Sequence, residues 1–398
     1  MYKGRIRPID VEALSHQVIR AEVAVVGCGD GANSGHRDGA CISANGGVAG
    51  SGRRTIYDVA GRAGVSLATV SRFMNGSGYV GAKARTRIEA AIRELDYVPS
   101  QPARALGGRG SGLVILGVRH LENPRWTEMA LAMETYLREH GLSLVLLSIG
   151  TERERELAAL EQMRRLRAEG VAIAMAHAEP GDFERLRRAG INVVTLAGYV
   201  ADPTLDAIFP DRPGGVEIAV EHLVSLGHRR IAVFDSSANR RAMETRVEAH
   251  LAVLRRFDLE ADPDLVFGVE QATMPAAGEL APRVRDSGAT AVICVGDVLA
   301  IGLWLALERL GVNVPGDLSI VGMDDVDLAG AVRSGLTTVA FERHEQARQV
   351  VELLVARMSG TGPDGPVHRR LEPRLLVRGS TAPVTPRYRG GRVAAHLT

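Results

Sequence analysis

The sequence predicts three short helices in a small N-terminal head, followed by an α/β body of two lobes built on parallel sheets. Residues 55–97 contain three short helical patterns, and from residue 112 onward β-branched runs alternate with amphipathic stretches. Continuous apolar strands separated by helices are typical of parallel sheets covered on both faces. The roughly 270 residues of this alternation exceed one doubly wound unit, so we expect two lobes with a cleft between them.

Composition places the chain among globular proteins without a membrane segment. Of its 398 residues, 45% are apolar, which is enough to bury a core in two or three domains. No apolar run reaches the ~18 residues that cross a bilayer. Charged side chains also occupy the start of the chain, where a signal peptide needs an apolar stretch. We therefore expect a cytoplasmic protein with no membrane partner.

The cysteines carry no chemistry that the sequence identifies. Cys28, Cys41 and Cys294 have no metal-ligand spacing, and their odd number leaves one without a disulfide partner. This usage fits a reducing compartment better than a disulfide framework. The sequence accordingly predicts neither a metal nor a cofactor.

Residues 1–52 are expected to form a flexible extension. They end in GCGDGANSGHRDGACISANGGVAGSG, which buries too little apolar surface to offset the entropy of ordering. Residues 23–31, VAVVGCGDG, are similar to a strand and a phosphate-binding glycine loop, but no apolar-periodic helix follows to complete such a site. A misassigned start or a dispensable tail is the favoured interpretation. Residues 383–398 lack a strong period and are predicted to be frayed.

The first two helices of the head are marked by capping residues. Thr55 can cap a helix whose third residue is Asp58, a carboxylate able to bond back to the cap amide. Gly64 supplies the positive φ of a tight corner, and Ser66 can begin a second helix within three residues. The spacing predicts a helix-turn-helix in a domain spanning residues 53–99.

A third helix over residues 82–97 is expected to cover the apolar faces of the first two. Its Ile88, Ile92 and Leu95 would meet a matching apolar set from the first two helices. That set is Ile56, Val59, Ala60, Val65, Val70, Phe73 and Met74, which leaves Ser66, Leu67, Ala68, Thr69, Ser71 and Arg72 on the free face.

The free face of the second helix suits a DNA major groove. Short polar side chains allow close approach and can donate to phosphates, and Arg72 is long enough to reach a guanine edge. An ordinary helical hairpin with a solvated arginine remains the alternative. Residues 53–106 hold nine basic and four acidic side chains, a net charge of +5 in a chain of net charge +1. A basic module on a mildly acidic body is typical of nucleic-acid binding.

Residues 100–111 are predicted to be a hinge. The stretch begins beside prolines and ends in glycines. Within it Arg104 can meet a phosphate, and Leu106 is an apolar residue with no evident core to join. Such a leucine can act as a minor-groove wedge that kinks the duplex. Its alternative role is packing against the next domain or a dimer mate.

The body is predicted from seven apolar runs and the helical patterns between them. Two clear helical patterns cover residues 152–170 and 297–311. The expected strands lie within residues 112–118, 143–149, 170–176, 191–197, 230–235, 290–296 and 318–324. From these strands and helices, we expect residues 112–382 to form one two-lobed domain.

These motifs together resemble the lactose-repressor (LacI/GalR) family of bacterial transcription regulators. The resemblance covers residues 53–382 and is most specific in residues 55–106, which follow the family pattern almost position by position. The resemblance implies a helix-turn-helix head and a body like periplasmic sugar-binding proteins. Further matching segments are residues 220–234, 296–325, 336–339 and 375–381.

The resemblance also implies how DNA would be bound. Leu67, Ala68 and Arg72 match the base-reading positions of the recognition helix, and Leu106 matches the hinge leucine inserted into the central step of a palindromic operator. Two subunits would then bind symmetric half-sites as a homodimer. Positions that match backbone contacts are Ser66, Thr69, Ser71 and Asn75. No C-terminal leucine heptad is present, so a coiled-coil tetramer is not expected.

A small-molecule effector, sugar-like or anionic, is implied between the lobes. Arg246 and Asp324 match family residues that meet polar effector groups, although an interlobe salt bridge is the alternative for this pair. Asp297 is assigned to the same site, and Trp126 offers either a stacking face or a core side chain. Ala197-Gly198 and Gly296 depart from the family's usual sugar-hydroxyl partners, which argues against a plain hexose.

The sequence is also compatible with two functions other than a DNA-binding regulator, most simply a repressor: an enzyme and a ligand-binding protein. An enzyme would have to use loose carboxylates such as Asp297, Asp324 and Asp325 with His228, without a nucleophile elbow or a phosphate loop. A ligand-binding protein of periplasmic type would have no use for the basic head. The sequence therefore favours a regulator that is not an enzyme.

Overall fold

The computed structural model describes residues 54–75, 78–97, 111–196, 202–236 and 240–384. It divides into two compact units. We call residues 54–97 the head and residues 112–384 the body. The predicted extension over residues 1–52, most of the predicted hinge, Arg104 and Leu106 lie outside the described residues.

The head consists of three helices, as predicted: α2 (Ile56–Ala63), α3 (Leu67–Asn75) and α4 (Ala82–Glu94). Thr55 and Asp58 form a reciprocal capping box, in which the Thr55 amide donates to Asp58 Oδ2 at 2.7 Å. Gly64 adopts φ 63°, a left-handed conformation that ends α2 and that glycine adopts without steric cost. The local sequence therefore fixes the corner between the first two helices.

One apolar cluster joins the three helices of the head. Val59, Val70 and Ile88 are fully buried at its centre, each from a different helix. The remaining predicted core residues, from Ile56 to Leu95, are buried in this cluster or packed against it. The predicted division of α3 into a buried and a free face is confirmed.

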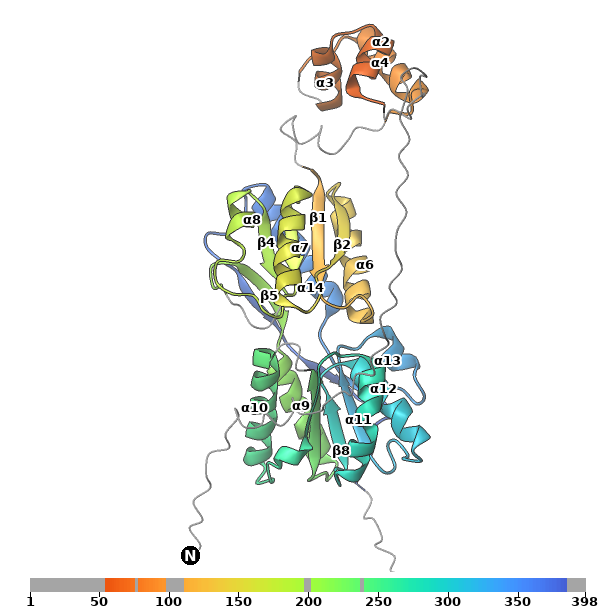
Figure 1. The fold of residues 1–398 in the computed structure, drawn as a ribbon, viewed down its shortest axis with the longest axis vertical. Helices are drawn as coiled ribbons and strands as arrows, with labels where there is room; N and C mark the ends of the chain where they lie inside the picture. The colour runs from red at the N-terminus through yellow and green to blue at the C-terminus, as the bar shows by residue number, and fades with distance from the viewer. Residues whose placement is uncertain (1–53, 76–77, 98–110, 197–201, 237–239, 385–398) are drawn as a thin grey trace, which may run out of the picture. The chain divides into compact units, whose positions relative to one another are not determined.

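The first lobe of the body is a six-stranded parallel sheet with helices on both faces (Figure 1). Its strand β1 (Leu113–Val118) is buried along its whole length, because Val114 and Leu116 face one helical layer while Leu113 and Ile115 face the other. The strand order is β11 (His368–Leu371), β5 (Asp206–Pro210), β4 (Asn192–Thr195), β3 (Gly170–Ile173), β1 and β2 (Ser143–Ser148). The helices are α6 (Pro124–Glu139) and α14 (Arg343–Met358) on one face, and α7 (Arg153–Arg165) and α8 (Glu184–Arg188) on the other.

The second lobe repeats this plan. Its sheet is parallel except for the edge strand β12, which pairs antiparallel with β10. The strand order is β12 (Arg374–Leu376), β10 (Thr337–Ala340), β9 (Ser319–Met323), β8 (Ala291–Cys294), β6 (Ile231–Ser236) and β7 (Val266–Val269), which the short 3-10 helix η2 (Pro263–Leu265) precedes. The helices are α9 (Arg212–Ser225) and α10 (Arg240–Arg256) on one face, and α11 (Met274–Asp286), α12 (Asp297–Arg309) and α13 (Asp327–Ala331) on the other.

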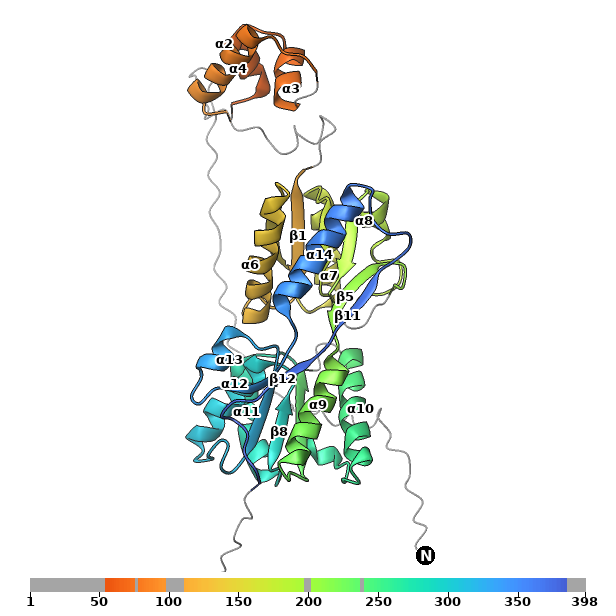
Figure 2. The same cartoon turned by 180° about the vertical axis from the view of Figure 1, so that it is seen from behind.

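The chain passes between the lobes three times. The crossings lie between β5 and α9, between β10 and α14, and between β11 and β12. Figure 2 shows the last crossing as one extended segment that runs from the first sheet to the second. The lobes are therefore not consecutive stretches of sequence, and the carboxyl ends of their strands can meet at a shared boundary.

Candidate functional site

Helix α3 presents the face that the sequence predicts for DNA. Ser66, Leu67, Ala68 and Arg72 are exposed, and Thr69 and Ser71 are partly exposed. Ser66 Oγ accepts the Thr69 amide at 3.2 Å, which caps the helix, and the two hydroxyl groups lie 2.8 Å apart. Asn75 is the last residue of α3, but its side chain lies outside the described part.

Two exposed tyrosines of the head were not singled out by sequence. Tyr57 on α2 is 70% exposed and Tyr79 before α4 is 89% exposed. An aromatic ring with a hydroxyl group on a cationic domain is suited to phosphate contact. The sequence could have indicated these two tyrosines, because the apolar core of the head is complete without their side chains.

A cavity of about 130 Å³ lies between the two lobes of the body. The residues that line it come from the carboxyl ends of strands and from the helices that follow, which is the usual place for a ligand in open α/β sheets. Its charged groups are Arg119 after β1, Arg125 on α6, Arg212 at the start of α9, Asp235 on β6, Arg246 on α10 and Asp324 after β9.

Asp324 lines this cavity, as predicted, and joins the two lobes. Its Oδ1 accepts from Arg212 Nη2 at 2.5 Å and lies 3.3 Å from Arg125 Nη1 of the first lobe. Asp324 has φ 115° and its neighbour Asp325 has φ 52°, conformations that residues with a Cβ adopt at a cost. Backbone strain of this kind is characteristic of ligand sites, where the surrounding fold holds it in place.

Arg246 also lines the cavity, but its partner is Asp235 rather than Asp324. Its Nε and Nη2 donate to the two oxygens of Asp235 at 2.6 and 2.9 Å. The pair belongs entirely to the second lobe, since α10 packs against β6. The alternative interpretation of Arg246 with Asp324 as one interlobe salt bridge therefore does not describe this structure.

Trp126 is a core side chain that also borders the cavity. The side chain is 8% exposed and belongs to the core under α6, yet it also lines the cavity. The guanidinium of Arg125 stacks over its ring at 5.2 Å from the centroid. Trp126 thus supports the position of a charged group in the cavity wall.

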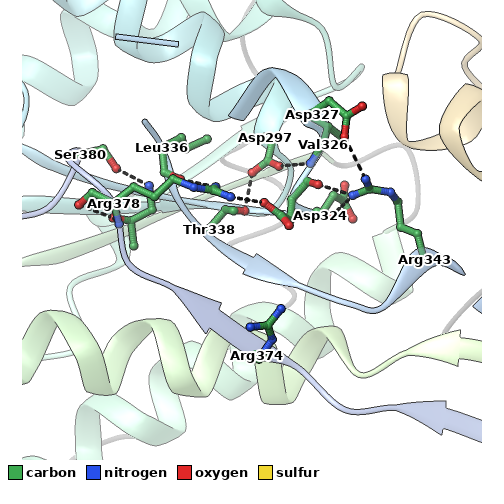
Figure 3. Close-up of polar contacts among 12 residues, drawn as sticks. Asp297, Asp324, Val326, Asp327, Leu336, Thr338, Arg343, Arg374, Arg378 and Ser380 are labelled. Carbon is green, nitrogen blue, oxygen red and sulfur yellow. Dashed lines mark hydrogen bonds and ion pairs between the residues drawn. The ribbon is translucent and has the colours of Figure 1, made fainter. Parts of the chain in front are cut away.

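Asp297, which the sequence assigns to the effector site, is buried behind the cavity wall in this structure. It is 1% exposed and is not among the residues that line the cavity. Its oxygens accept from the Val326 amide at 2.9 Å and from Thr338 Oγ1 at 2.6 Å (Figure 3). Burial, followed by the charge of nearby Asp324, raises the pKa of Asp297 to about 7. Through its hydrogen bond with the Val326 amide, Asp297 stabilises the loop that carries Asp324.

Sequence analysis missed four charged residues of the cavity: Arg119, Arg125, Arg212 and Asp235. They lie far apart in the sequence, and only the parallel sheets bring them together. A signal does exist for two of them, because Arg119 and Asp235 stand at the carboxyl ends of strongly apolar strands. Such positions meet at one edge of a doubly wound sheet.

Comparisons with known proteins agree with this architecture. Residues 55–100 match the family described as bacterial regulatory proteins, lacI family, and residues 220–381 match a periplasmic binding protein-like domain. The HTH-type transcriptional regulator MalR of Streptomyces coelicolor is 32% identical over 336 residues, which are 82% of this chain and 96% of MalR. Within the described ranges, none of the helices has the length and apolar character needed to span a bilayer.

Two solved structures extend the comparison to three dimensions. The lac repressor dimer bound to operator and the anti-inducer ONPF is 25% identical with a TM-score of 0.70, over 83% of this chain and 100% of that one. The complex of the transcriptional regulator CelR with cellobiose is 27% identical with a TM-score of 0.61, over 82% and 100%. The chain therefore belongs to the lacI family of bacterial regulatory proteins and is a DNA-binding transcriptional regulator.

Proposed function

We propose that this regulator represses transcription by binding an inverted-repeat operator as a homodimer, and that a small molecule between its lobes sets its affinity for DNA. The observation that carries the DNA half is the exposed polar face of α3, from Ser66 to Arg72, on a helix whose opposite face is packed in the core of the head. A helix presented in this way can enter the major groove without rearrangement of the domain.

Within α3, we assign base contacts to Leu67, Ala68 and Arg72. The guanidinium can bond two acceptors of a guanine edge, and the small apolar side chains permit close approach. Phosphate contacts then fall to the flanking polar residues and fix the register of the helix in the groove. These are Ser66, Thr69, Ser71 and Asn75. In the predicted hinge, Arg104 contacts a phosphate and Leu106 acts at the minor groove.

The homodimer follows from the size of the DNA-reading unit. A single nine-residue helix contacts few base pairs, so a second copy is needed for a site that is rare in a genome. A two-fold dimer presents two recognition helices to two half-sites in inverted order. The lac repressor, whose fold this chain shares, is seen as a dimer bound to operator.

The effector site is proposed to be the cavity that contains Trp126, Arg246 and Asp324. Arg125 and Asp324 pair across the lobes there, so a ligand that contacts either group changes how the lobes are held together. Effector and operator would then be coupled, each changing the affinity of the other by the same factor. The related regulator CelR is seen in complex with cellobiose, a small polar molecule, which supports this assignment.

We further propose that the protein is not an enzyme and that it acts on the nucleoid in the cytoplasm. The groups considered for catalysis have structural partners. Both ring nitrogens of His228 are engaged, one with Thr290 Oγ1 and the other with the Ala382 carbonyl, each at 3.0 Å. Asp325 accepts from Arg378 Nη2 at 2.7 Å, so its carboxylate is also engaged.

The proposal is tested by fluorescence anisotropy with duplexes that carry inverted repeats from upstream of the gene, beside scrambled duplexes of equal length. We expect Arg72→Ala to weaken operator binding by about 5- to 150-fold, equivalent to about 1–3 kcal/mol, and to leave binding to scrambled DNA nearly intact. Arg93→Ala, an exposed arginine of α4, is the matched control and should keep specific affinity. Equal affinity of the wild type for all duplexes, or a monomer in light scattering, would contradict the proposal.

A further inference from the structure

The cavity between the lobes contains more cationic than anionic side chains. Its lining includes four guanidinium groups and two carboxylates: Arg119, Arg125, Arg212 and Arg246, and Asp235 and Asp324. His120 also lines it, and burial followed by the charge of Arg119 lowers the pKa of its imidazole. The lining therefore carries a formal excess of two positive charges.

Both carboxylates of the lining are already engaged by arginines. Asp235 uses both oxygens for Arg246, and Asp324 Oδ1 is shared by Arg212 and Arg125. Their ion pairs are with Arg125, Arg212 and Arg246, and not with Arg119. The excess positive charge is thus concentrated in the part of the wall that the first lobe contributes.

Arg119 has no hydrogen-bond or ion-pair partner among the described residues. Its Nε is fully shielded from solvent without an acceptor. The negative charges of Glu156 and Asp235 favour the charged form of Arg119, but the Glu156 oxygens accept from the amides of Ala176 and His177 at 2.6 and 3.0 Å. Burial lowers the pKa of Arg119 to about 10, which still leaves the guanidinium protonated at neutral pH.

Arg125 offers further unused donors on the same wall. It is 3% exposed, and its Nε and Nη1 have no hydrogen-bond acceptor, although Nη1 lies 3.3 Å from Asp324 Oδ1. Its remaining nitrogen, Nη2, donates to Gln346 Oε1 at 3.1 Å, which fixes the guanidinium in place. A charged group buried in this way without full pairing is costly to the folded protein.

On the basis of the function proposed above, we propose that the effector carries a carboxylate or phosphate group, and that Arg119 and Arg125 bind this group. An anion would supply the acceptors that these guanidinium groups lack, through charge-assisted hydrogen bonds of matching planar geometry. A neutral sugar would add hydroxyl groups only. It would leave the positive charge uncompensated, and the carboxylates that usually bind sugar hydroxyls are already paired here.

The first test uses inorganic phosphate, which has no carbon skeleton to match. Thermal unfolding of the full chain is measured in phosphate and in chloride at equal ionic strength. We expect phosphate to raise the Tm of the wild type, and expect Arg119→Gln to lose the effect while Arg185→Gln, an exposed arginine of α8, keeps it. An equal rise in Arg119→Gln would overturn the inference, and so would the lack of a phosphate-specific rise in the wild type together with no advantage of gluconate over glucose in the second test.

The second test separates the two kinds of anion and guards against misfolding. Calorimetry compares glucose, gluconate and glucose 6-phosphate, which share one carbon skeleton. At least one acid should bind at least about tenfold more tightly than glucose, with the advantage lost in Arg119→Gln and partly kept in Arg119→Lys, which retains the charge. Without ligand, Arg119→Gln should unfold at the same or a higher temperature than the wild type, because it removes an unpaired charge. A lower Tm would indicate a structural ion pair and overturn the inference.

Operator binding distinguishes this inference from the function on which it rests. If glucose alone changes the affinity for operator DNA, the anionic effector is wrong and the proposed regulation stands. If an acid binds through Arg119 but leaves operator affinity unchanged, the anion site stands and the proposed coupling is wrong.

Discussion

Replacing Asp297 by asparagine is expected to remove a pH dependence from the stability of the second lobe. Asp297 is buried behind the loop of Asp324, and its pKa is about 7 against an ordinary value of 3.8. The unfolded chain releases this proton near pH 4, whereas the folded chain keeps it to near pH 7. The stabilising effect of Asp297 is therefore fully present below pH 4 and is lost as the pH rises to 7.

The magnitude follows from the size of the shift. A difference of about three pKa units corresponds to about 4 kcal/mol, at ~1.4 kcal/mol for each unit. The folded wild type should thus lose up to ~1.4 kcal/mol of unfolding free energy per pH unit between pH 4 and 7 through this group alone. Asparagine stays neutral, and its amide can still accept from the Val326 amide and donate to Thr338 Oγ1, so its own stability should lack this slope.

The assay is urea unfolding at pH 5, 6, 7 and 8 followed by tryptophan fluorescence. Trp304 lies on α12, the helix that begins at Asp297, and reports on the second lobe when Trp126 of the first lobe is replaced by phenylalanine in every protein compared. The difference between wild type and Asp297→Asn cancels the titration of other groups, and Asp364→Asn, an exposed aspartate, is the control. Parallel curves for wild type and Asp297→Asn, or an equal loss of stability at every pH, would show that Asp297 is ionised throughout and refute the argument.

Two further predictions concern the DNA-binding half of the protein. In anisotropy titrations, Leu106→Ala should markedly weaken binding to operator duplexes but leave salt-dependent binding to scrambled duplexes nearly intact. The reason is that a wedge acts only where the duplex is kinked. Equal losses for both kinds of duplex would mean that Leu106 only packs against protein. Gly64→Ala should destabilise the head by about 1 kcal/mol, because φ 63° strains a residue with a Cβ, and should speed hydrogen exchange of α2 and α4. Gly61→Ala is its control, since that glycine lies inside α2 with open space around it, and an equal effect of both would refute the strain argument.

The sequence predicts the fold well where apolar runs are long. All seven predicted strands of the body are present, and β1 shows why, since its residues are buried on both faces and leave a continuous apolar signal. Strands of weaker composition were missed. β5 begins with an aspartate and ends with a proline, and the edge strand β11 consists of a histidine, two arginines and a leucine, mostly exposed. Short β7, β10 and β12 were also missed.

The site is less predictable because it is assembled across the fold. Asp324 and Arg246 were found through the resemblance and do meet in one cavity, but Arg119 and Arg125 have no periodic pattern that marks them. Asp297 shows how local packing redirects a side chain. It stands beside Gly296, which lines the cavity, yet the first turn of α12 directs its carboxylate away toward Thr338 and Val326. Packing decides which of two adjacent residues faces the cavity, and the sequence alone does not reveal this packing.

The contact of Arg125 with Asp324 has a consequence for dose response. Arg125 belongs to the first lobe and Asp324 to the second, so the protein supplies its own carboxylate to the guanidinium that an acidic effector would seek. Such an effector competes with the Asp324 carboxylate, which belongs to the same chain and is therefore always present at high local concentration. Its apparent Kd equals its intrinsic Kd divided by the fraction of molecules in which Arg125 is not paired with Asp324. The regulator would therefore respond when the acid accumulates and ignore traces of it.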